Sequence, residues 1–212
     1  FRNSQKKIGG REMKKGGVGG ANTKTGLAFE FKTDLPNFIS KQSGYEVVEN
    51  DFDIKLVKRT GEVRKIKRSS TARWIVNFEG EKVAEIFQKH GLYRCFVEVD
   101  LNYKAIISKK LLPDDSIFVM DNNTVFIIEK KTQKTQGSVD EKLQTCGFKL
   151  KQYKKLFSPI NKEVKYYYLL DEWFLNSNYK DVLDYIISVG CYYRFNYIPL
   201  KEFGLPIPKE EI

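Results

Sequence analysis

Apolar residues along the chain fall into short runs that are separated by glycine and polar residues. Between residues 44 and 78 the runs YEVVE, FDIKLVKR, EVRKIK and ARWIVNFE are rich in β-branched and aromatic residues. Runs of this kind predict strands, and RTGE (59–62) is placed to form a hairpin turn. A second pair, SIFVM (116–120) and TVFIIEKK (124–131), flanks the polar stretch DNN and predicts another hairpin.

Other segments repeat their apolar residues at helical spacing. These predict helices over residues 25–41, 81–91, 138–157 and 179–190. Ser138 and Glu141 are spaced as a capping box at the start of the third helix. Further strands are expected at YRCFVEV (93–99) and EVKYYYLLDEWF (163–174), and YRFNYIPL (193–200) is a final strand or edge segment.

The alternation of helices and strands predicts an α/β (α+β) fold in which helices flank a mixed β-sheet. We expect one domain over residues 24–212, with a basic strand insertion at about 44–78 that forms an added β-hairpin region. Residues 1–23 form a glycine-rich arm, which is either unstructured or a loop that lies on a phosphate backbone. Its glycines do not have the spacing of a Walker P-loop, because no GK[ST] follows.

The charge of the chain narrows the class of partner. Lys and Arg number 37 and Asp and Glu 27, a net charge of +10, which indicates either a solvated basic surface or a polyanion such as nucleic acid. The three cysteines are odd in number and widely spaced, which favours a reducing cytoplasmic location. No apolar run approaches the ~20 residues of a membrane span, and the first residues show no signal-peptide pattern. We therefore expect a cytoplasmic protein with no membrane partner.

The second hairpin carries the candidate chemistry. Side chains alternate along a strand, so Glu129 and Lys131 share one face. A turn centred on Asn122 places Asp115 opposite Glu129. A turn centred half a residue further on places Asp114 opposite Lys131. Either register gathers an aspartate, a glutamate and a lysine, which form either a surface salt-bridge cluster or a Mg²⁺ site.

These residues also carry a resemblance to a known family. Pro113–Asp114, fourteen residues and then Glu129–Lys130–Lys131 resemble the PD-(D/E)xK pattern of magnesium-dependent nucleases. The setting of strand, turn, strand and helix is similar to that superfamily's α-β-β-β-α-β core, a restriction-endonuclease-like core, over roughly residues 24–172. The resemblance implies that Asp114 and Glu129 bind the metal and that Lys131 assists the nucleophile. Asp115 remains the alternative aspartate.

Two longer stretches refine the resemblance. GGANTKTGLAFE and GSVDEKLQTCGFKLKQYKKL look like segments of type II restriction endonucleases. In the PD-(D/E)xK nucleases a glutamate of the first helix often joins the site, and Glu30 matches that place. The resemblance implies sequence-specific, Mg²⁺-dependent cleavage of double-stranded DNA, and two-strand cleavage is consistent with a homodimer on DNA. The alternatives are a structure-specific repair nuclease or junction resolvase of the same fold, and a non-catalytic DNA-binding module.

DNA recognition is expected on the basic hairpin. Arginine reads guanine in a bidentate way, and lysine holds phosphates. The alternative is an exposed hairpin that only adds solubility. The residues proposed to bind DNA are Arg59, Arg64, Lys65, Lys67, Arg68 and Arg73.

Overall fold

The computed structural model describes residues 33–56, 60, 62–67, 72–134 and 139–208. Within these residues the centre of the fold is a mixed seven-stranded sheet in the order β1-β4-β5-β6-β7-β8-β9. The strands from β1 to β7 in this order pair antiparallel, whereas β7, β8 and β9 run parallel. The strands are β1 (Tyr45–Glu49), β4 (Arg73–Phe78), β5 (Glu81–Phe87), β6 (Asp115–Val119), β7 (Thr124–Lys131), β8 (Glu163–Leu170) and β9 (Tyr192–Phe195).

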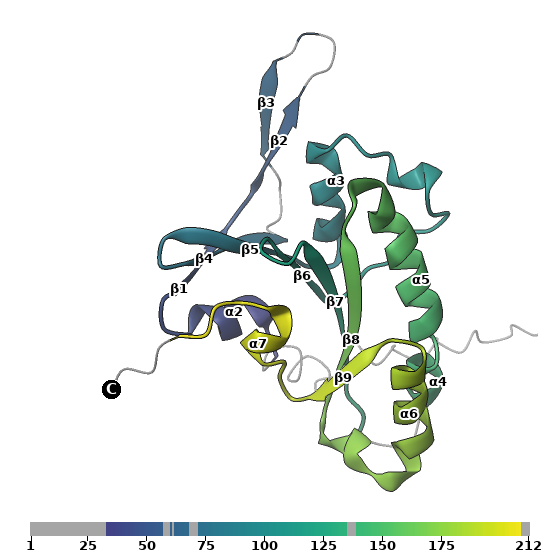
Figure 1. The fold of residues 1–212 in the computed structure, drawn as a ribbon. Helices are drawn as coiled ribbons and strands as arrows, with labels where there is room; N and C mark the ends of the chain where they lie inside the picture. Colours follow the sequence, from purple (N-terminus) through teal and green to yellow (C-terminus); the bar gives the residue numbers. More distant parts are fainter. Residues whose placement is uncertain (1–32, 57–59, 61, 68–71, 135–138, 209–212) are drawn as a thin grey trace, which may run out of the picture.

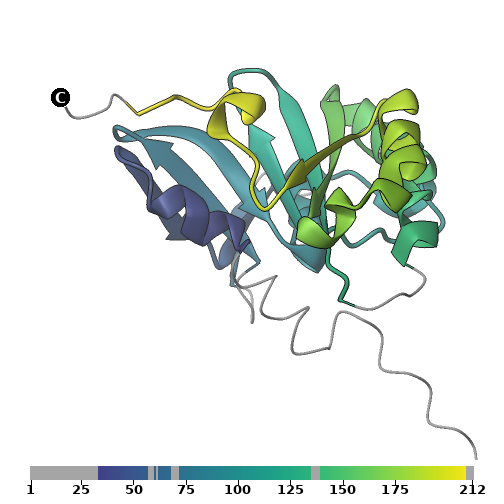
Figure 2. The same ribbon diagram turned by 90° about the horizontal axis from the view of Figure 1, so that it is seen from below.

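Helices cover both faces of this sheet, as Figure 2 shows. One face carries α5 (Cys146–Phe157) and α6 (Lys180–Ser188), and the other carries α2 (Leu35–Ser40) and α7 (Leu200–Phe203). Short helical pieces complete the described residues: η2 (Lys89–Arg94), α3 (Cys95–Glu98), η3 (Tyr103–Ala105), α4 (Val139–Leu143), η4 (Ser158–Ile160), η5 (Glu172–Leu175) and η6 (Ser177–Tyr179). The expected mixed α/β architecture is therefore confirmed, and no helix among the described residues is long and apolar enough to cross a bilayer.

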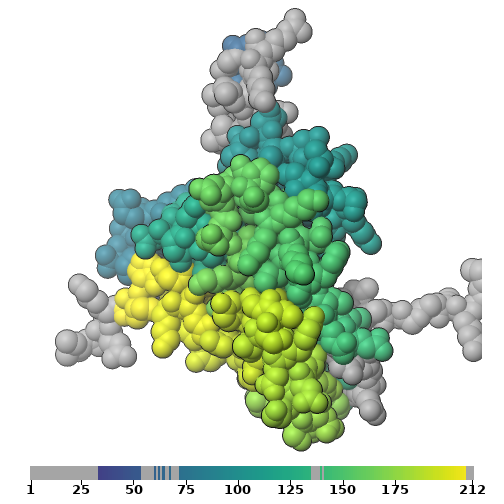
Figure 3. Space-filling model, turned by 45° about the vertical axis from the view of Figure 1, so that its right-hand side comes forward, coloured from purple at the N-terminus to yellow at the C-terminus, as the bar shows by residue number. Residues whose placement is uncertain are grey.

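Two hydrophobic cores lie on opposite faces of the sheet. Val125 and Ile127 of β7 join the core under α5, with Leu150, Tyr153 and other residues of that helix. Phe126 and Ile128 of the same strand join the core under α2 and α7. Side chains alternate across a strand, so a strand covered on both faces reads as a continuous apolar run. In Figure 3 the residues of α5 and α6 form one continuous outer face.

The helix expected over residues 81–91 is wrong, because residues 81–87 form the inner strand β5. Phe78 of β4 pairs with Glu81, and the two residues between them, Glu79 and Gly80, have φ of 49° and 87°. Positive φ at both central residues is the geometry of the tight turns that match the twist of a hairpin. The apolar residues at 83, 86 and 87 fit helical spacing equally well, which is the known ambiguity of short buried runs.

The strand expected over residues 93–99 is also wrong. This segment forms η2 and α3, and its apolar side chains Leu92, Tyr93 and Phe96 pack in the α5-side core at helical spacing. The helix expected over residues 138–157 is divided, because α4 ends at Leu143 and α5 begins at Cys146. Its capping residue Ser138 lies outside the described residues.

The basic segment between β1 and β4 forms a separate two-stranded sheet. It consists of β2 (Phe52–Leu56) and β3 (Val63–Lys67), which pair antiparallel. Figure 1 shows this β2–β3 hairpin extending away from the main sheet beyond the end at which α3 lies. The expected hairpin is present, and Phe52 and Asp53 at its base contact Arg94 of η2.

Two glycines give a direct test of the packing. A Cβ on Gly91 of η2 would lie 2.0 Å from the backbone oxygen of Ala72, so Gly91→Ala should lower the free energy of unfolding by about 1–3 kcal/mol. A Cβ on Gly147 of α5 would meet Val189 at an ordinary 3.4 Å, so Gly147→Ala should raise it by about 0.5–1 kcal/mol. Urea unfolding measures both, and changes of the same sign would contradict the packing.

Candidate functional site

The register of β6 and β7 decides which aspartate meets Glu129. Asp115 pairs with Ile128 and Val119 with Thr124, so the turn is Met120–Asn123. The turn is therefore centred between Asp121 and Asn122. This centre lies half a residue before one of the two registers considered from the sequence and one residue before the other. Continued by one residue, it brings Asp114 level with Glu129.

On the α5 side of the sheet, two carboxylates converge on one lysine. Lys131 Nζ lies 3.1 Å from Glu129 Oε2 and 3.9 Å from Asp114 Oδ2. All three side chains are partly shielded from water, Glu129 the most. The structure thus brings together the three residues that the sequence pattern singled out, at the end of β7 and just before β6.

Lys130 fixes the two aspartates from opposite faces of the sheet. Its backbone N–H donates to Asp114 Oδ2 at 2.8 Å, while its buried ammonium forms an ion pair with Asp115 Oδ2 at 2.6 Å. Asp115 Oδ1 also accepts from Gln88 Nε2 at 2.8 Å. Asp115 therefore faces away from Glu129, and the geometry favours Asp114 over Asp115 as the partner of Glu129.

A second lysine completes the site, and it was not singled out as a site residue from the sequence. Lys149 Nζ of α5 donates to Glu129 Oε1 at 2.8 Å, so two ammonium groups bracket one carboxylate. Lys149 lies between Cys146 and Tyr153 on the buried side of α5. A lysine on the apolar stripe of a helix is the signal that could have found it, because a lysine on such a stripe requires a partner.

The electrostatics of the two faces differ. Burial of Glu129 disfavours its charged form, but Lys131 and Lys149 outweigh burial and lower the pKa of its carboxyl group. At Asp115 burial dominates, and the pKa is raised in spite of Lys130 and the hydrogen bond from Gln88. Glu129 consequently keeps its charge to a lower pH than a free glutamate does, and the ionised form of a carboxylate is the one that binds a cation.

Tyrosines line the core beneath Glu129. Tyr153 and Tyr166 are buried, and burial together with the charge of Glu129 raises the pKa of both phenols. Tyr168 donates to the backbone oxygen of Lys142 at 3.0 Å, and its ring lies 5.9 Å from Lys131 Nζ. These neutral rings shield the charged groups from water on the inner side, which strengthens electrostatic interactions there.

The site has the oxygen donors that Mg²⁺ prefers, but few of them. Among the described residues there is no group of three or more His, Cys, Asp and Glu side chains arranged for a metal ion. Asp114 and Glu129 supply two carboxylates, with Lys131 and Lys149 as their cationic neighbours. Mg²⁺ is commonly bound through one or two carboxylates, with water and phosphate oxygens completing its shell. The residues present fit that mode of binding. Glu30 lies outside the described residues.

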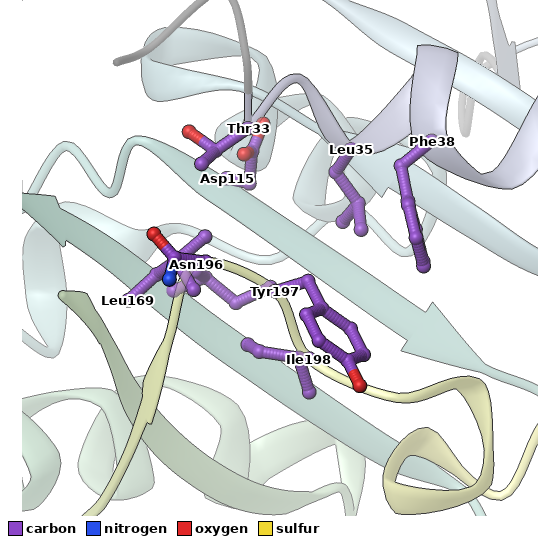
Figure 4. A pocket seen from close by; sticks show the side chains of 9 residues that line it. Thr33, Leu35, Phe38, Asp115, Leu169, Asn196, Tyr197 and Ile198 are labelled. Atoms are coloured by element: carbon purple, nitrogen blue, oxygen red, sulfur yellow. The ribbon is translucent and has the colours of Figure 1, made fainter. Parts of the chain in front are cut away.

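On the opposite face, Asp115 borders a small cavity of about 40 Å³. Figure 4 shows Asp115 and Thr33 on one side of the cavity and Asn196, Tyr197 and Ile198 on the other. The cavity has room for water but not for a nucleotide. Asp115 is therefore a structural carboxylate beside a cavity, with Lys130 and Gln88 as its partners.

The residues expected to bind DNA are only partly described. Arg59 and Arg68 lie outside the described residues, and Lys65 is described only as part of β3. Arg64 and Lys67 are exposed on β3, and Arg64 lies 3.3 Å from Glu62. The exposed positions of Arg64 and Lys67 leave both side chains accessible to a partner.

Arg73 does not fit the prediction that it contacts DNA. It is 4 % exposed, and its guanidinium forms ion pairs with Glu85 at 2.6 Å and with Glu98 at 2.5 Å. Burial disfavours the charge on Arg73, but the bonds and charges of Glu98 and Glu85 outweigh burial and raise its pKa. Because its donors are committed to the buried Glu85 and the partly exposed Glu98, Arg73 is a structural residue at the base of the hairpin.

Comparisons with known proteins add no assignment. No protein-family model, no curated protein and no solved structure matches the chain. The interpretation of the site consequently depends on its geometry and on the sequence pattern.

Glu129 and Asp115 should affect stability in acid in opposite ways. Glu129 has a lowered pKa in the folded protein. Its contribution to the free energy of unfolding is therefore present above the ordinary pKa of 4.5 and is lost as the pH falls through the folded pKa. Asp115 has a raised pKa, so its buried charge costs stability at neutral pH, and this cost disappears as the pH falls towards the ordinary 3.8.

Urea unfolding between about pH 3 and pH 7 measures this difference. Glu129→Gln should flatten the loss of stability in acid relative to the wild type, and Asp115→Asn should make that loss steeper. Curves that run parallel to the wild-type curve for both variants would show that the two carboxyl groups are not perturbed as described.

Proposed function

We propose that this protein is a magnesium-dependent endonuclease that hydrolyses phosphodiester bonds in double-stranded DNA at specific sequences, as a type II restriction enzyme does. One observation carries the proposal: Asp114, Glu129 and Lys131 converge at the end of the β6–β7 hairpin. This is the residue set that the PD-(D/E)xK pattern implies, and its two carboxylates share one lysine.

The order of the elements supports the proposal. β5, β6 and β7 form an antiparallel meander, α5 crosses over one face, and β8 returns parallel to β7. This succession resembles the β-β-β-α-β part of the restriction-endonuclease-like core. The site residues lie at one end of the meander, at the end of β7 and just before β6.

The proposed roles follow from the contacts. Asp114 and Glu129 would hold Mg²⁺, which lowers the pKa of bound water and neutralises charge on the scissile phosphate. Lys131 would orient the attacking water and stabilise charge that develops on the phosphate. Lys130 holds Asp114 through its backbone N–H, so it positions a ligand without contacting the substrate.

The β2–β3 hairpin supports sequence-specific recognition over the alternatives. Its strands carry the exposed side chains of Arg64 and Lys67 and extend from the same end of the molecule as α3. A structure-specific repair nuclease or junction resolvase shares the proposed core but needs no base-reading arm. A non-catalytic DNA-binding module needs no paired carboxylates at the end of the meander. A homodimer on DNA would supply two sites for two-strand cleavage.

The experiment that tests the proposal is incubation of plasmid and branched DNA with the protein and Mg²⁺, followed by mapping of the ends. Discrete plasmid fragments with one sequence at their ends are expected. Cleavage of branched DNA alone would select the repair alternative, and binding without any cleavage would select the non-catalytic module.

Variants at the site should separate chemistry from binding. Glu129→Ala and Lys131→Ala should abolish Mg²⁺-dependent cleavage yet leave folding and DNA binding largely intact, since neither residue lies in the hydrophobic cores. Asp114→Asn should lose cleavage in the same way. Lys151→Met, at an exposed position of α5, is the matched control and should keep full activity. Full activity of either alanine variant would contradict the site.

Recognition by the hairpin should show in the ratio of specific to non-specific affinity. Arg64→Ala should cost about 1–3 kcal/mol at the cognate sequence if its guanidinium reads a base, and little on random DNA. Competition binding in Ca²⁺, which blocks catalysis, measures this ratio. Equal losses on both kinds of DNA would make Arg64 a phosphate contact only.

A further inference from the structure

A cluster of buried charged side chains lies at the base of the β2–β3 hairpin. At its centre is Asp53 of β2, which is fully buried. Arg94 Nε donates to Asp53 Oδ1 at 2.6 Å, and a second Arg94 nitrogen donates to the backbone oxygen of Phe52 at 2.9 Å. Arg94 thus holds both the side chain and the backbone of the first residues of the hairpin.

Arg73 extends the cluster into the body of the protein. Its guanidinium lies 3.7 Å from Asp53, 2.6 Å from Glu85 of β5 and 2.5 Å from Glu98 of α3. Arg73 itself begins β4, the strand that follows the hairpin. One guanidinium therefore links the hairpin, the main sheet and α3.

The charges of the cluster are balanced. Asp53, Glu85 and Glu98 face Arg73 and Arg94, and Lys82 also pairs with Glu85. A buried charge that loses its partner is strongly unfavourable. Each carboxylate of the cluster faces a guanidinium, although Arg94 Nη1 has no hydrogen-bond partner among the described residues. The cluster consequently fixes the direction in which the hairpin leaves the body.

The segment η2, which contacts the hairpin through Arg94, also contacts the residues that lead into β6 and the candidate site. Tyr93, next to Arg94, accepts from the backbone N–H of Leu111 at 2.8 Å and donates to its oxygen at 3.0 Å. The backbone N–H of Lys89 donates to the oxygen of Pro113 at 2.9 Å, directly before Asp114. The hairpin and Asp114 are therefore mounted on the same short segment, η2 and α3.

We propose that the largely buried cluster of Asp53, Arg73, Glu85 and Arg94, with Glu98 at its edge, holds the β2–β3 hairpin as a preorganised arm for the phosphate backbone of double-stranded DNA, at a fixed orientation to the candidate site. The proposal rests on the proposed function for its partner. Arg73 was expected from the sequence to contact DNA. The proposal instead gives it an indirect role, in which it affects DNA binding by holding the hairpin.

The chemistry of the partner follows from the charge of the arm. Residues 55–68 contain Lys55, Lys58, Arg59, Arg64, Lys65, Lys67 and Arg68, against Glu62. Lysine and arginine that neutralise phosphates release counterions from duplex DNA, and this favours binding. An arm fixed before binding loses less conformational entropy when it binds, and so binds more tightly than a mobile arm of the same charge.

The test uses a pair of variants that remove the same charge from the same hairpin. Asp53→Asn removes the buried carboxylate, and Glu62→Gln removes an exposed carboxylate near the end of the hairpin. By charge alone, both changes should tighten binding to DNA. The proposal predicts opposite signs: Glu62→Gln tightens binding by up to about twofold, and Asp53→Asn weakens it by roughly tenfold because the loosened arm must be ordered.

A second readout reports the orientation of the arm without DNA. Thr60 is exposed, and Thr60→Cys can carry a maleimide fluorophore. The native thiols compete poorly, because Cys146 and Cys191 are buried and burial raises the pKa of Cys95. Time-resolved anisotropy of the label should show faster local motion in Asp53→Asn than in the wild type, with no change in Glu62→Gln.

Binding is measured by titration of a DNA duplex in Ca²⁺, and folding of each variant by thermal unfolding. If Asp53→Asn does not fold, Glu98→Gln replaces it, because that carboxylate lies at the edge of the cluster with 32 % of its side chain exposed. Unchanged label motion, or tighter DNA binding in the cluster variant, would overturn the proposal. A third outcome is that the label moves faster in Asp53→Asn while the wild-type protein binds no DNA duplex. That pair of results would contradict the proposed function but would support the role of the cluster in holding the hairpin.

Discussion

The pairing of β6 with β7 is the constraint on which the candidate site depends. Side chains alternate across β7, so Glu129 and Lys131 turn towards α5 while Ile128 and Lys130 turn towards α2. The register then sends Asp114 to the first face and Asp115 to the second. A slip of one residue would exchange the two aspartates and separate the cluster. Lys130 secures this register, because its backbone binds one aspartate and its side chain the other.

Charge compensation organises the molecule at two places. At the end of β7, Lys131 and Lys149 compensate the charge of Glu129, which is itself nearly buried. At the base of the hairpin, Arg73 and Arg94 pair with the buried Asp53 and Glu85 and with Glu98 at the edge of the cluster. The difference in burial gives the two sets different consequences. The two lysines keep 18 % and 24 % of their side chains exposed, whereas the buried arginines hold a fixed geometry.

Much of the site could be predicted from the sequence, because the fold there depends on local patterns. Two apolar runs around a polar turn predict the hairpin of residues 116–131, and the site residues lie at set positions along its strands.

The errors arose where one sequence pattern fits two structures. The apolar spacing of β5 suits a helix, and only the tight turn at Glu79 and Gly80 favours a strand. Arg73 looks like its basic neighbours, and its burial depends on acids from distant elements, Glu85 and Glu98. The contact of Lys149 with Glu129 likewise depends on how α5 lies over the sheet, and the apolar periodicity of the helix alone does not specify that position.

The most direct measurement is the anomalous diffraction of a crystal soaked in Mn²⁺, which substitutes for Mg²⁺ and can be located by its own scattering. The arrangement predicts a peak between the carboxylates of Asp114 and Glu129, on the α5 side of the sheet, with Lys149 displaced from Glu129 Oε1. A peak at Asp115 on the opposite face, or no peak between Asp114 and Glu129, would contradict the assignment of this cluster as a metal-dependent nuclease site.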